Sequence, residues 1–285
     1  DVVQLLVNAN AGLDACCTLK RTPLHRAAFG RDSATARVLI NANAAIDARD
    51  SENRTQLSSA LSFGHSEVVR LLVEAKASLD AEDDPNSSLL LTAAARGDVV
   101  TIQALIHARA DVNVCDSHLK TTPLHLAGLC GHNAAAHTLL RARANVNVQD
   151  KNCRSALHLA AQCGHFAAVQ LLIASNATVD TRDQYDQTPL LLAAKHGRSD
   201  CMWMLIAAKA SVNVSDKART TPLHWAASGG NIVGAQLLID AKAFLNGEND
   251  FRYTPLHYAA FNDHAPIVQL LVNANALIDV RNKDN

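Results

Sequence analysis

Apolar residues along the chain fall in pairs of short helical stretches, and polar turns separate one pair from the next. In one such stretch Val68, Val69, Leu71 and Leu72 follow helical spacing. A glycine, Gly64, precedes this stretch and divides it from a shorter one. Other stretches end in an extended piece such as residues 111–114. The pattern predicts a repeated unit of two helices followed by an extended turn.

The unit returns with a fixed period. Clear copies of a Thr-Pro-Leu-His string begin at Thr22, Thr122, Thr221 and Thr254, and weaker copies begin at positions 55, 88, 155 and 188. The eight starts are therefore 22, 55, 88, 122, 155, 188, 221 and 254, spaced by 33 residues except for one interval of 34. One helical hairpin cannot bury its own apolar face, so the units must stack against one another.

Each unit carries the local signals of a helical hairpin. The opening Thr suits a helix N-cap, and the Pro after it suits the first turn, where a missing N–H costs nothing. Glycine recurs nine residues after the opening residue in six of the units, where it suits a left-handed break between two helices. These glycines are Gly64, Gly97, Gly131, Gly164, Gly197 and Gly230.

These strings resemble the TPLHxAA signature of the ankyrin-repeat family, and the 33-residue length matches over essentially the whole chain. The resemblance implies an all-α solenoid of stacked antiparallel helix pairs with short β-turn fingers. It also implies a concave face formed by the fingers and the first helices. We expect one array over residues 1–285, with a partial repeat in residues 1–21 and eight full repeats. In the family the histidine of the string is buried and bonds between repeats, which here implies that role for His25, His125, His158, His224 and His257.

The two ends lack a recognisable polar capping repeat. Residues 1–7 match the second helix of a repeat, and residue 285 falls inside a finger. Isolated arrays need polar caps for solubility. We therefore expect a segment of a longer array, or ends that are covered by further repeats or by another chain.

Two glycines typical of the family are absent throughout. The fingertip position holds Lys20, Asn53, Asn86, Lys120, Cys153, Asp186, Arg219 and Arg252. The turn after the second helix holds Asn10, Asn43, Lys76, Arg109, Arg143, Asn176, Lys209, Lys242 and Asn275. If these turns keep a left-handed backbone, each Lys or Arg costs about 1 kcal/mol or more. The second and third repeats also lose the Pro and the His, so we expect local weakness or a bend near residues 50–100.

Composition narrows the possible functions. The 26 basic and 27 acidic residues nearly balance, so no global field attracts nucleic acid or an anionic membrane. The apolar runs are far shorter than the roughly 20 residues of a membrane span. Seven cysteines without a CxxC pair argue against a disulfide framework. We therefore expect an intracellular setting, cytoplasmic or nuclear.

Catalytic and metal sites are not expected. The sequence has no nucleophile elbow, phosphate-binding glycine loop or HExxH motif. The strongest metal candidate pairs Cys130 and His132 with Cys163 and His165 one repeat later. Stacked helices lie about 8–10 Å apart, whereas zinc ligands lie about 2.0–2.3 Å from the metal. We expect no enzyme, no cofactor and no metal in this segment.

A partner-binding surface is the favoured hypothesis. Ankyrin proteins make contacts mostly through the fingers and through exposed first-helix positions. The position four residues after the opening Thr changes from polar to apolar to aromatic along the chain, and aromatic residues also gather in the last fingers. Tyr, Trp and Arg are favoured at interface hot spots. The candidate contact residues are Leu126, Leu159, Tyr185, Leu192, Arg219, Trp225, Phe251, Arg252, Tyr253, Tyr258 and Phe261.

Three functions remain open at this point. The first is a protein-binding scaffold that uses these residues, with Trp203 on a second helix as a possible second contact. The alternative for the first-helix positions is that they are only the edge of the core. The second function is a structural spacer or assembly subunit within a larger complex. The third is contact with an anionic ligand or nucleic acid along a basic edge formed by Lys76, Arg109, Arg143, Lys209 and Lys242.

Overall fold

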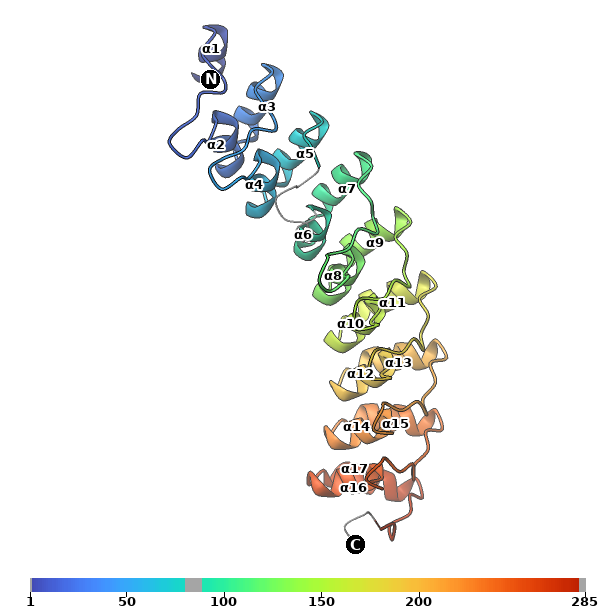
Figure 1. Ribbon diagram of the computed structural model, residues 1–285. Coiled ribbons are helices and arrows are strands. Elements are labelled where there is room, and N and C mark those ends of the chain that lie inside the picture. The colour runs from blue at the N-terminus through green and yellow to red at the C-terminus, as the bar shows by residue number, and fades with distance from the viewer. Residues whose placement is uncertain (1, 80–88, 282–285) are drawn as a thin grey trace. The chain divides into compact units, whose positions relative to one another are not determined.

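The computed structural model describes residues 2–79 and 89–281, and over these ranges the chain forms seventeen helices and no strand (Figure 1). The first helices of the repeats are α2 (Pro23–Phe29), α4 (Gln56–Phe63), α6 (Leu89–Arg96), α8 (Pro123–Cys130), α10 (Ala156–Cys163), α12 (Pro189–Lys195), α14 (Pro222–Ser228) and α16 (Pro255–Phe261). The second helices are α3 (Ser33–Asn41), α5 (Ser66–Glu74), α7 (Val99–His107), α9 (Asn133–Arg141), α11 (Phe166–Ala174), α13 (Ser199–Ala207), α15 (Ile232–Asp240) and α17 (Ala265–Asn273). A single helix, α1 (Val2–Asn8), precedes them. The predicted all-α solenoid of helix pairs is confirmed.

The opening Thr caps the first helix as the sequence predicts. The Oγ1 of Thr254 accepts the N–H of His257, and Pro255 occupies the first helical position. The imidazole Nδ1 of His257 in turn accepts the N–H of Thr254 at 3.1 Å. This reciprocal pair satisfies main-chain donors that the start of a helix would otherwise leave free.

A left-handed residue joins the two helices of each hairpin. Gly64 and Gly164 have φ values of 73° and 85°. Arg31 and Asp263 take the corresponding place in the first and eighth repeats, and both keep a left-handed backbone, with φ of 58° and 57°. The left-handed turn therefore forms in every repeat, including the two in which the residue is not glycine.

The missing family glycines leave the other turns unchanged. Every described fingertip and post-helix residue named above has a positive φ, including Lys120 at 56° and Lys209 at 68°. These turns therefore keep the left-handed backbone that glycine favours, and the Lys and Arg residues adopt it at a cost in conformational energy. Asn86, at the fingertip before the third repeat, and Ser88, at its start, lie outside the described residues.

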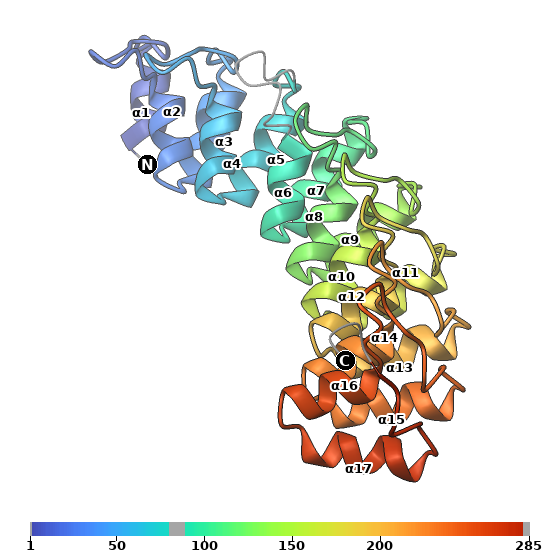
Figure 2. The same ribbon diagram turned by 60° about the horizontal axis from the view of Figure 1, so that its bottom comes forward.

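The chain divides into two compact units. The N-terminal unit comprises Asp1–Ala127 and Ala134–Ala144, and the C-terminal unit comprises Gly128–Asn133 and Asn145–Asn285. The prediction of one uninterrupted array over all 285 residues stays a prediction. In the C-terminal unit α10, α12, α14 and α16 form one row, and α11, α13, α15 and α17 form a second row beside it (Figures 1 and 2).

The core of the C-terminal unit lies between these rows. It repeats the same side chains in each copy, with Leu157, Leu190 and Leu223 fully buried below small alanines. Alanine at the facing positions lets neighbouring helices approach closely. The first helices are thereby held in a fixed register, which also fixes the fingers that precede them.

Packing in the N-terminal unit changes between the second and third repeats. Helices α4 and α6 pack less extensively than α2 and α4, while α5 and α7 pack more extensively than α3 and α5. Ser58 stands where five of the eight repeats have a histidine, and its hydroxyl donates to the main-chain oxygen of Thr55 in its own turn. The second repeat thus lacks the imidazole that, at His25 of the first repeat, contacts the main-chain oxygen of Arg54 in the next finger.

Candidate partner-binding surface

The fingers of the C-terminal unit form a hydrogen-bonded row. The N–H of Gln184 donates to the oxygen of Asn152 at 2.9 Å, and the N–H of Lys217 donates to the oxygen of Tyr185 at 3.1 Å. The N–H of Asp250 continues the row by donating to Ala218 at 3.1 Å. Each fingertip is therefore fixed by its neighbour and presents its side chains from a rigid backbone.

An acidic or amide side chain shapes each finger from within. The Oδ1 of Asp183 accepts the N–H groups of Tyr185 and Gln187 at 2.8 and 2.9 Å. Asn249 does the same for Phe251 and Tyr253, both at 3.0 Å. These bonds close a tight turn and direct the side chains at its tip, Tyr185 and Phe251, outward.

Buried histidines connect the first helices to the next finger. The Nε2 of His224 lies 3.0 Å from the oxygen of Tyr253, and the Nδ1 of the same ring accepts the N–H of Thr221 at 3.1 Å. Burial lowers the pKa of His224, which favours the neutral ring that this arrangement requires. His224 is therefore structural, and it sets the position of Tyr253.

Three aromatic rings gather at the base of the last described finger. The ring centroids of Tyr253 and Tyr258 lie 5.8 Å apart, and Tyr253 also contacts His257 edge-on at 5.6 Å. The side-chain amide of Asn249 donates to the hydroxyl of Tyr258 at 3.0 Å. Tyr253 lies just before α16 and Tyr258 lies on it. Both rings are half-exposed, and the hydroxyl of Tyr258 is held by its hydrogen bond to Asn249.

Trp225 lies one repeat earlier, on α14, and is also half-buried. The ammonium of Lys195 lies 4.8 Å from the centre of the indole ring, at cation–π distance. Among the described residues, the indole N–H has no hydrogen-bond partner. A buried donor without a partner costs free energy, so the indole N–H of Trp225 is a group that a partner could satisfy.

Comparison with known families agrees with this geometry. A family model for ankyrin repeats, three copies long, matches residues 1–83, 130–216 and 204–284. The chain belongs to the ankyrin-repeat family. The comparison with curated proteins finds no match. Ankyrin repeats generally mediate protein–protein interaction, so the family points to a protein partner without naming one.

The ankyrin fold exposes some of the predicted contact residues strongly. Tyr185, Phe251 and Phe261 are 57%, 59% and 82% exposed. Arg219 and Arg252 are also exposed, and Arg252 pairs with Glu248 at 3.2 Å. Apolar rings with this much exposure gain little from the fold itself, which leaves them available to a partner.

Two of the predicted contact residues belong instead to the core. Leu159 and Leu192 are only 3% and 4% exposed, because neighbouring repeats cover position four of α10 and α12. They do not enter the surface considered below. Leu126 is half-buried and belongs to the N-terminal unit, so it is described apart from the C-terminal residues.

Trp203 projects from the second row of helices. It lies on α13, is 52% exposed and stacks against Phe166 with ring centroids 6.4 Å apart. The first helices and fingers belong to the other row. Trp203 is therefore separate from the residues gathered around Trp225 and Tyr258.

Lys195 and Asn249 are site residues that the sequence reading did not single out. Lys195 falls seven residues after Thr188, a position that is exposed in the family, so its place could have been inferred. Its contact with Trp225 depends on the stacking of adjacent repeats. Asn249 stands where most other fingers have an aspartate, and its side chain contacts Tyr258.

One of the four residues considered for a metal, His165, contacts the main chain of the preceding repeat. The Nε2 of His165 lies 3.0 Å from the main-chain oxygen of Leu129, which links two repeats of the C-terminal unit. Within residues 2–79 and 89–281, no group of three or more His, Cys, Asp or Glu side chains could hold a metal ion. Over the same ranges, no helix combines the length and apolar character needed to cross a membrane.

Proposed function

We propose that the chain is a non-catalytic scaffold that binds a protein partner through the fingers and first helices of its C-terminal unit. The exposed aromatic residues of the last repeats carry this proposal. Tyr185, Phe251 and Phe261 are solvent-exposed, and the half-buried rings of Trp225 and Tyr258 belong to the same row of helices. Aromatic and arginine side chains supply most of the binding energy in protein interfaces.

The rigidity of the fingers supports the same proposal. Main-chain hydrogen bonds fix each finger before any partner arrives. A preorganised surface loses little conformational entropy on binding, so more of the contact energy appears as affinity. Arg219, which is exposed at a fingertip, favours a partner with acidic side chains around an apolar centre.

Site-specific photocrosslinking tests the proposal. Benzoylphenylalanine placed at Phe261 or Phe251 should capture one discrete partner from extracts of the source cells, because both side chains are exposed and their replacement leaves the fold intact. Benzoylphenylalanine at Trp203, on the other row of helices, is the matched control. Equal capture of the same protein from all three positions, or none from Phe251 and Phe261, would contradict the proposal.

Affinity measurements with the captured protein then distinguish a protein-binding scaffold from a structural spacer. Phe261→Ala and Phe251→Ala should each weaken binding by about 1–2 kcal/mol, which is five- to thirtyfold. Their melting temperatures should match the wild type. A spacer held by its ends would bind equally well with either change.

A further inference from the structure

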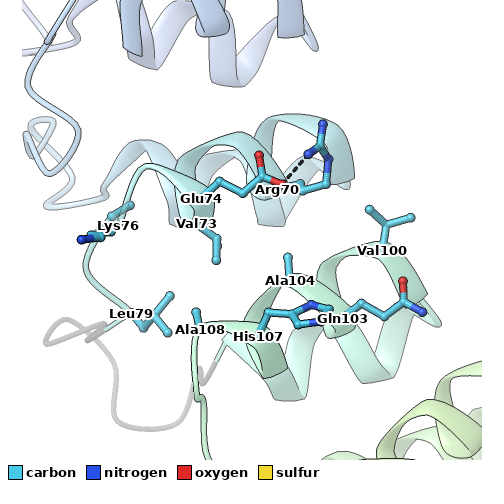
Figure 3. Close-up of a pocket in the computed structure, with 11 residues that line it drawn as sticks. Arg70, Val73, Glu74, Lys76, Leu79, Val100, Gln103, Ala104, His107 and Ala108 are labelled. Atoms are coloured by element: carbon cyan, nitrogen blue, oxygen red, sulfur yellow. Dashed lines mark hydrogen bonds and ion pairs between the residues drawn. The ribbon is translucent and has the colours of Figure 1, made fainter. Parts of the chain in front are cut away.

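A pocket of about 680 Å³ lies between α5 and α7 in the N-terminal unit (Figure 3). Val73 and Ala104 line it beside the polar side chains of Arg70, Glu74 and Gln103. Arg70 already contacts Glu74. This mixed lining selects no single class of ligand. A chemically more specific feature lies in the C-terminal unit, in the turns that follow the second helices.

An Asn or Asp side chain links each of these turns to the next repeat. The Oδ1 of Asn246 accepts the main-chain N–H of Leu277 at 2.9 Å, and the Oδ1 of Asn213 accepts that of Phe244 at 2.7 Å. The equivalent acceptors earlier in the same unit are Asn147 and Asp180. Either an amide or a carboxylate therefore serves at this position.

Asn246 differs from the other acceptors in the residue that follows it. Gly247 comes next, whereas the corresponding residues after the other three acceptors are Val148, Thr181 and Val214. Gly247 does not have a positive φ, and a Cβ built on it would meet no atom closer than the Cε1 of His224 at 3.8 Å. The fold therefore does not require glycine at this position. What the missing side chain changes is the reactivity of the preceding asparagine.

An asparagine followed by glycine undergoes a spontaneous rearrangement. The main-chain nitrogen of Gly247 attacks the side-chain Cγ of Asn246, which closes a cyclic succinimide and releases ammonia. Water then opens the ring at either carbonyl, so that the product is aspartate or isoaspartate, and neither an oxidant nor a second protein is needed. A side chain on the attacking residue restricts the approach, and a β-branched side chain restricts it most.

The surroundings of Asn246 permit this reaction. Asn246 is exposed and lies in a turn outside the helices. Within the described part of the chain, the N–H of Gly247 donates no hydrogen bond, so the attacking nitrogen is not held in place. The bond to Leu277 engages the amide oxygen of Asn246, whereas the amide nitrogen is the group that leaves.

We propose that Asn246 is a site of spontaneous deamidation, and that its isoaspartate product loosens the attachment of the eighth repeat. Aspartate keeps the acceptor for Leu277, as Asp180 does for Ser211 at 3.0 Å. Isoaspartate instead routes the main chain through the former side chain and lengthens it by one carbon. The acceptor is thereby displaced from the N–H of Leu277, and the link between the two turns is lost.

Peptide mapping of the whole chain, aged at pH 8 in its folded state, tests the chemistry. Trypsin places Asn213 and Asn246 in separate peptides, residues 210–217 and 243–252. Asn246 should deamidate about tenfold or more faster than Asn213, which valine follows, and electron-transfer fragmentation should identify isoaspartate among the products. Digestion in heavy-oxygen water marks any deamidation that occurs after ageing. A rate at Asn246 no higher than that at Asn213 would overturn the proposal.

Two substitutions should move the reactivity. Gly247→Ala should lower the rate at Asn246 toward that at Asn213, and the space around Gly247 accommodates the added methyl group. Val214→Gly should raise the rate at Asn213, because it places glycine after an equivalent acceptor. If Val214→Gly failed to fold, Gly247→Ala would decide alone, since an unchanged rate at Asn246 in that variant contradicts the proposal.

Hydrogen exchange tests the structural consequence. In aged chains separated by ion exchange and enriched in isoaspartate, the amide of Leu277 should exchange faster than in the wild type. Asn246→Asp should keep its protection, because the carboxylate retains the acceptor. The amide of Phe244, which is bonded to Asn213, is the internal control and should not change. Unchanged protection of Leu277 in the isoaspartate form would overturn the proposed loosening of the eighth repeat.

Discussion

The imidazole of His158 joins two repeats by contacting the main-chain oxygen of Gln187, with Nε2 at 3.1 Å from that oxygen. The other ring nitrogen, Nδ1, accepts the N–H of Ser155 at 3.0 Å. A ring that accepts at Nδ1 and donates at Nε2 is neutral, because the protonated ring has no acceptor. The stack therefore depends on the protonation state of its linking histidines.

This dependence predicts loss of stability in mild acid. Burial lowers the pKa of His25, His158 and His224 below the usual value of 6.5. The unfolded chain then binds more protons than the folded chain as the pH falls below about 6.5, so the free energy of unfolding decreases there and is fully retained above that value. Urea titrations at pH 7.5, 6.5 and 5.5 should show a falling midpoint. An NMR titration in which His158 protonates at or above pH 6.5 would refute the explanation.

The stacked helix pairs can be predicted from the sequence because the same local helix signals return in each repeat. Thr254, Pro255 and His257 begin a helix by rules that need no knowledge of distant contacts, and the eightfold repetition removes doubt about the register. Exposure is harder to predict. Leu192 and Trp225 share one position, yet Leu192 is buried and Trp225 is half-exposed under Lys195. That difference depends on the side-chain volumes in neighbouring repeats, which the repeat period alone does not specify.

Substitution by alanine should reduce the free energy of unfolding by different amounts at Gly230 and at Gly197. Both have left-handed backbones, with φ of 68° and 69°. A Cβ on Gly230 would lie 2.9 Å from the Cε1 of His264, whereas a Cβ on Gly197 would meet nothing within 4 Å. Gly197→Ala should cost about 1 kcal/mol from the backbone alone. Gly230→Ala should cost about 1 kcal/mol more, because the displaced ring weakens the 3.1 Å bond from His264 to the oxygen of Ser228.

Urea midpoints of the two glycine variants, measured side by side, check this difference. Repeat arrays do not always unfold in one step, so fluorescence and circular dichroism should be followed together. Equal losses for Gly230→Ala and Gly197→Ala would show that His264 moves aside without cost.

Replacing the lysines in the left-handed turns by glycine should stabilise the fold. Lys209 and Lys242 are exposed and have φ values of 68° and 66°. Lys209→Gly and Lys242→Gly should each raise the free energy of unfolding by about 0.5–1 kcal/mol, the relieved strain less the extra entropy of glycine in the unfolded chain. Lys217→Gly, in a neighbouring finger without a positive φ, should lower it. Thermal melts of the three variants decide the matter, and a loss at Lys209 would mean that its turn is not strained.

The thiol of Cys17, in the first finger, should be more reactive at neutral pH than an ordinary cysteine. It occupies the position of Asp50 one repeat later, whose Oδ1 accepts the N–H groups of Glu52 and Arg54 at 2.9 and 3.0 Å. The N–H groups of Arg21 and Leu19 lower the pKa of the exposed Cys17 thiol in the same way, because they stabilise the thiolate. Cys17 should therefore reach its half-maximal rate of alkylation by iodoacetamide at a lower pH than N-acetylcysteine amide.

Mass spectrometry of the alkylated peptides supplies an internal control, because burial raises the pKa of Cys201 to about 11 and its thiol is covered. Cys201 should react only after the chain is unfolded in urea, where it should match the reference thiol. Cys17 should lose its advantage under the same conditions, since the finger that supplies its N–H donors is gone. An unchanged rate for Cys17 in urea would show that its reactivity comes from the local sequence and not from the turn.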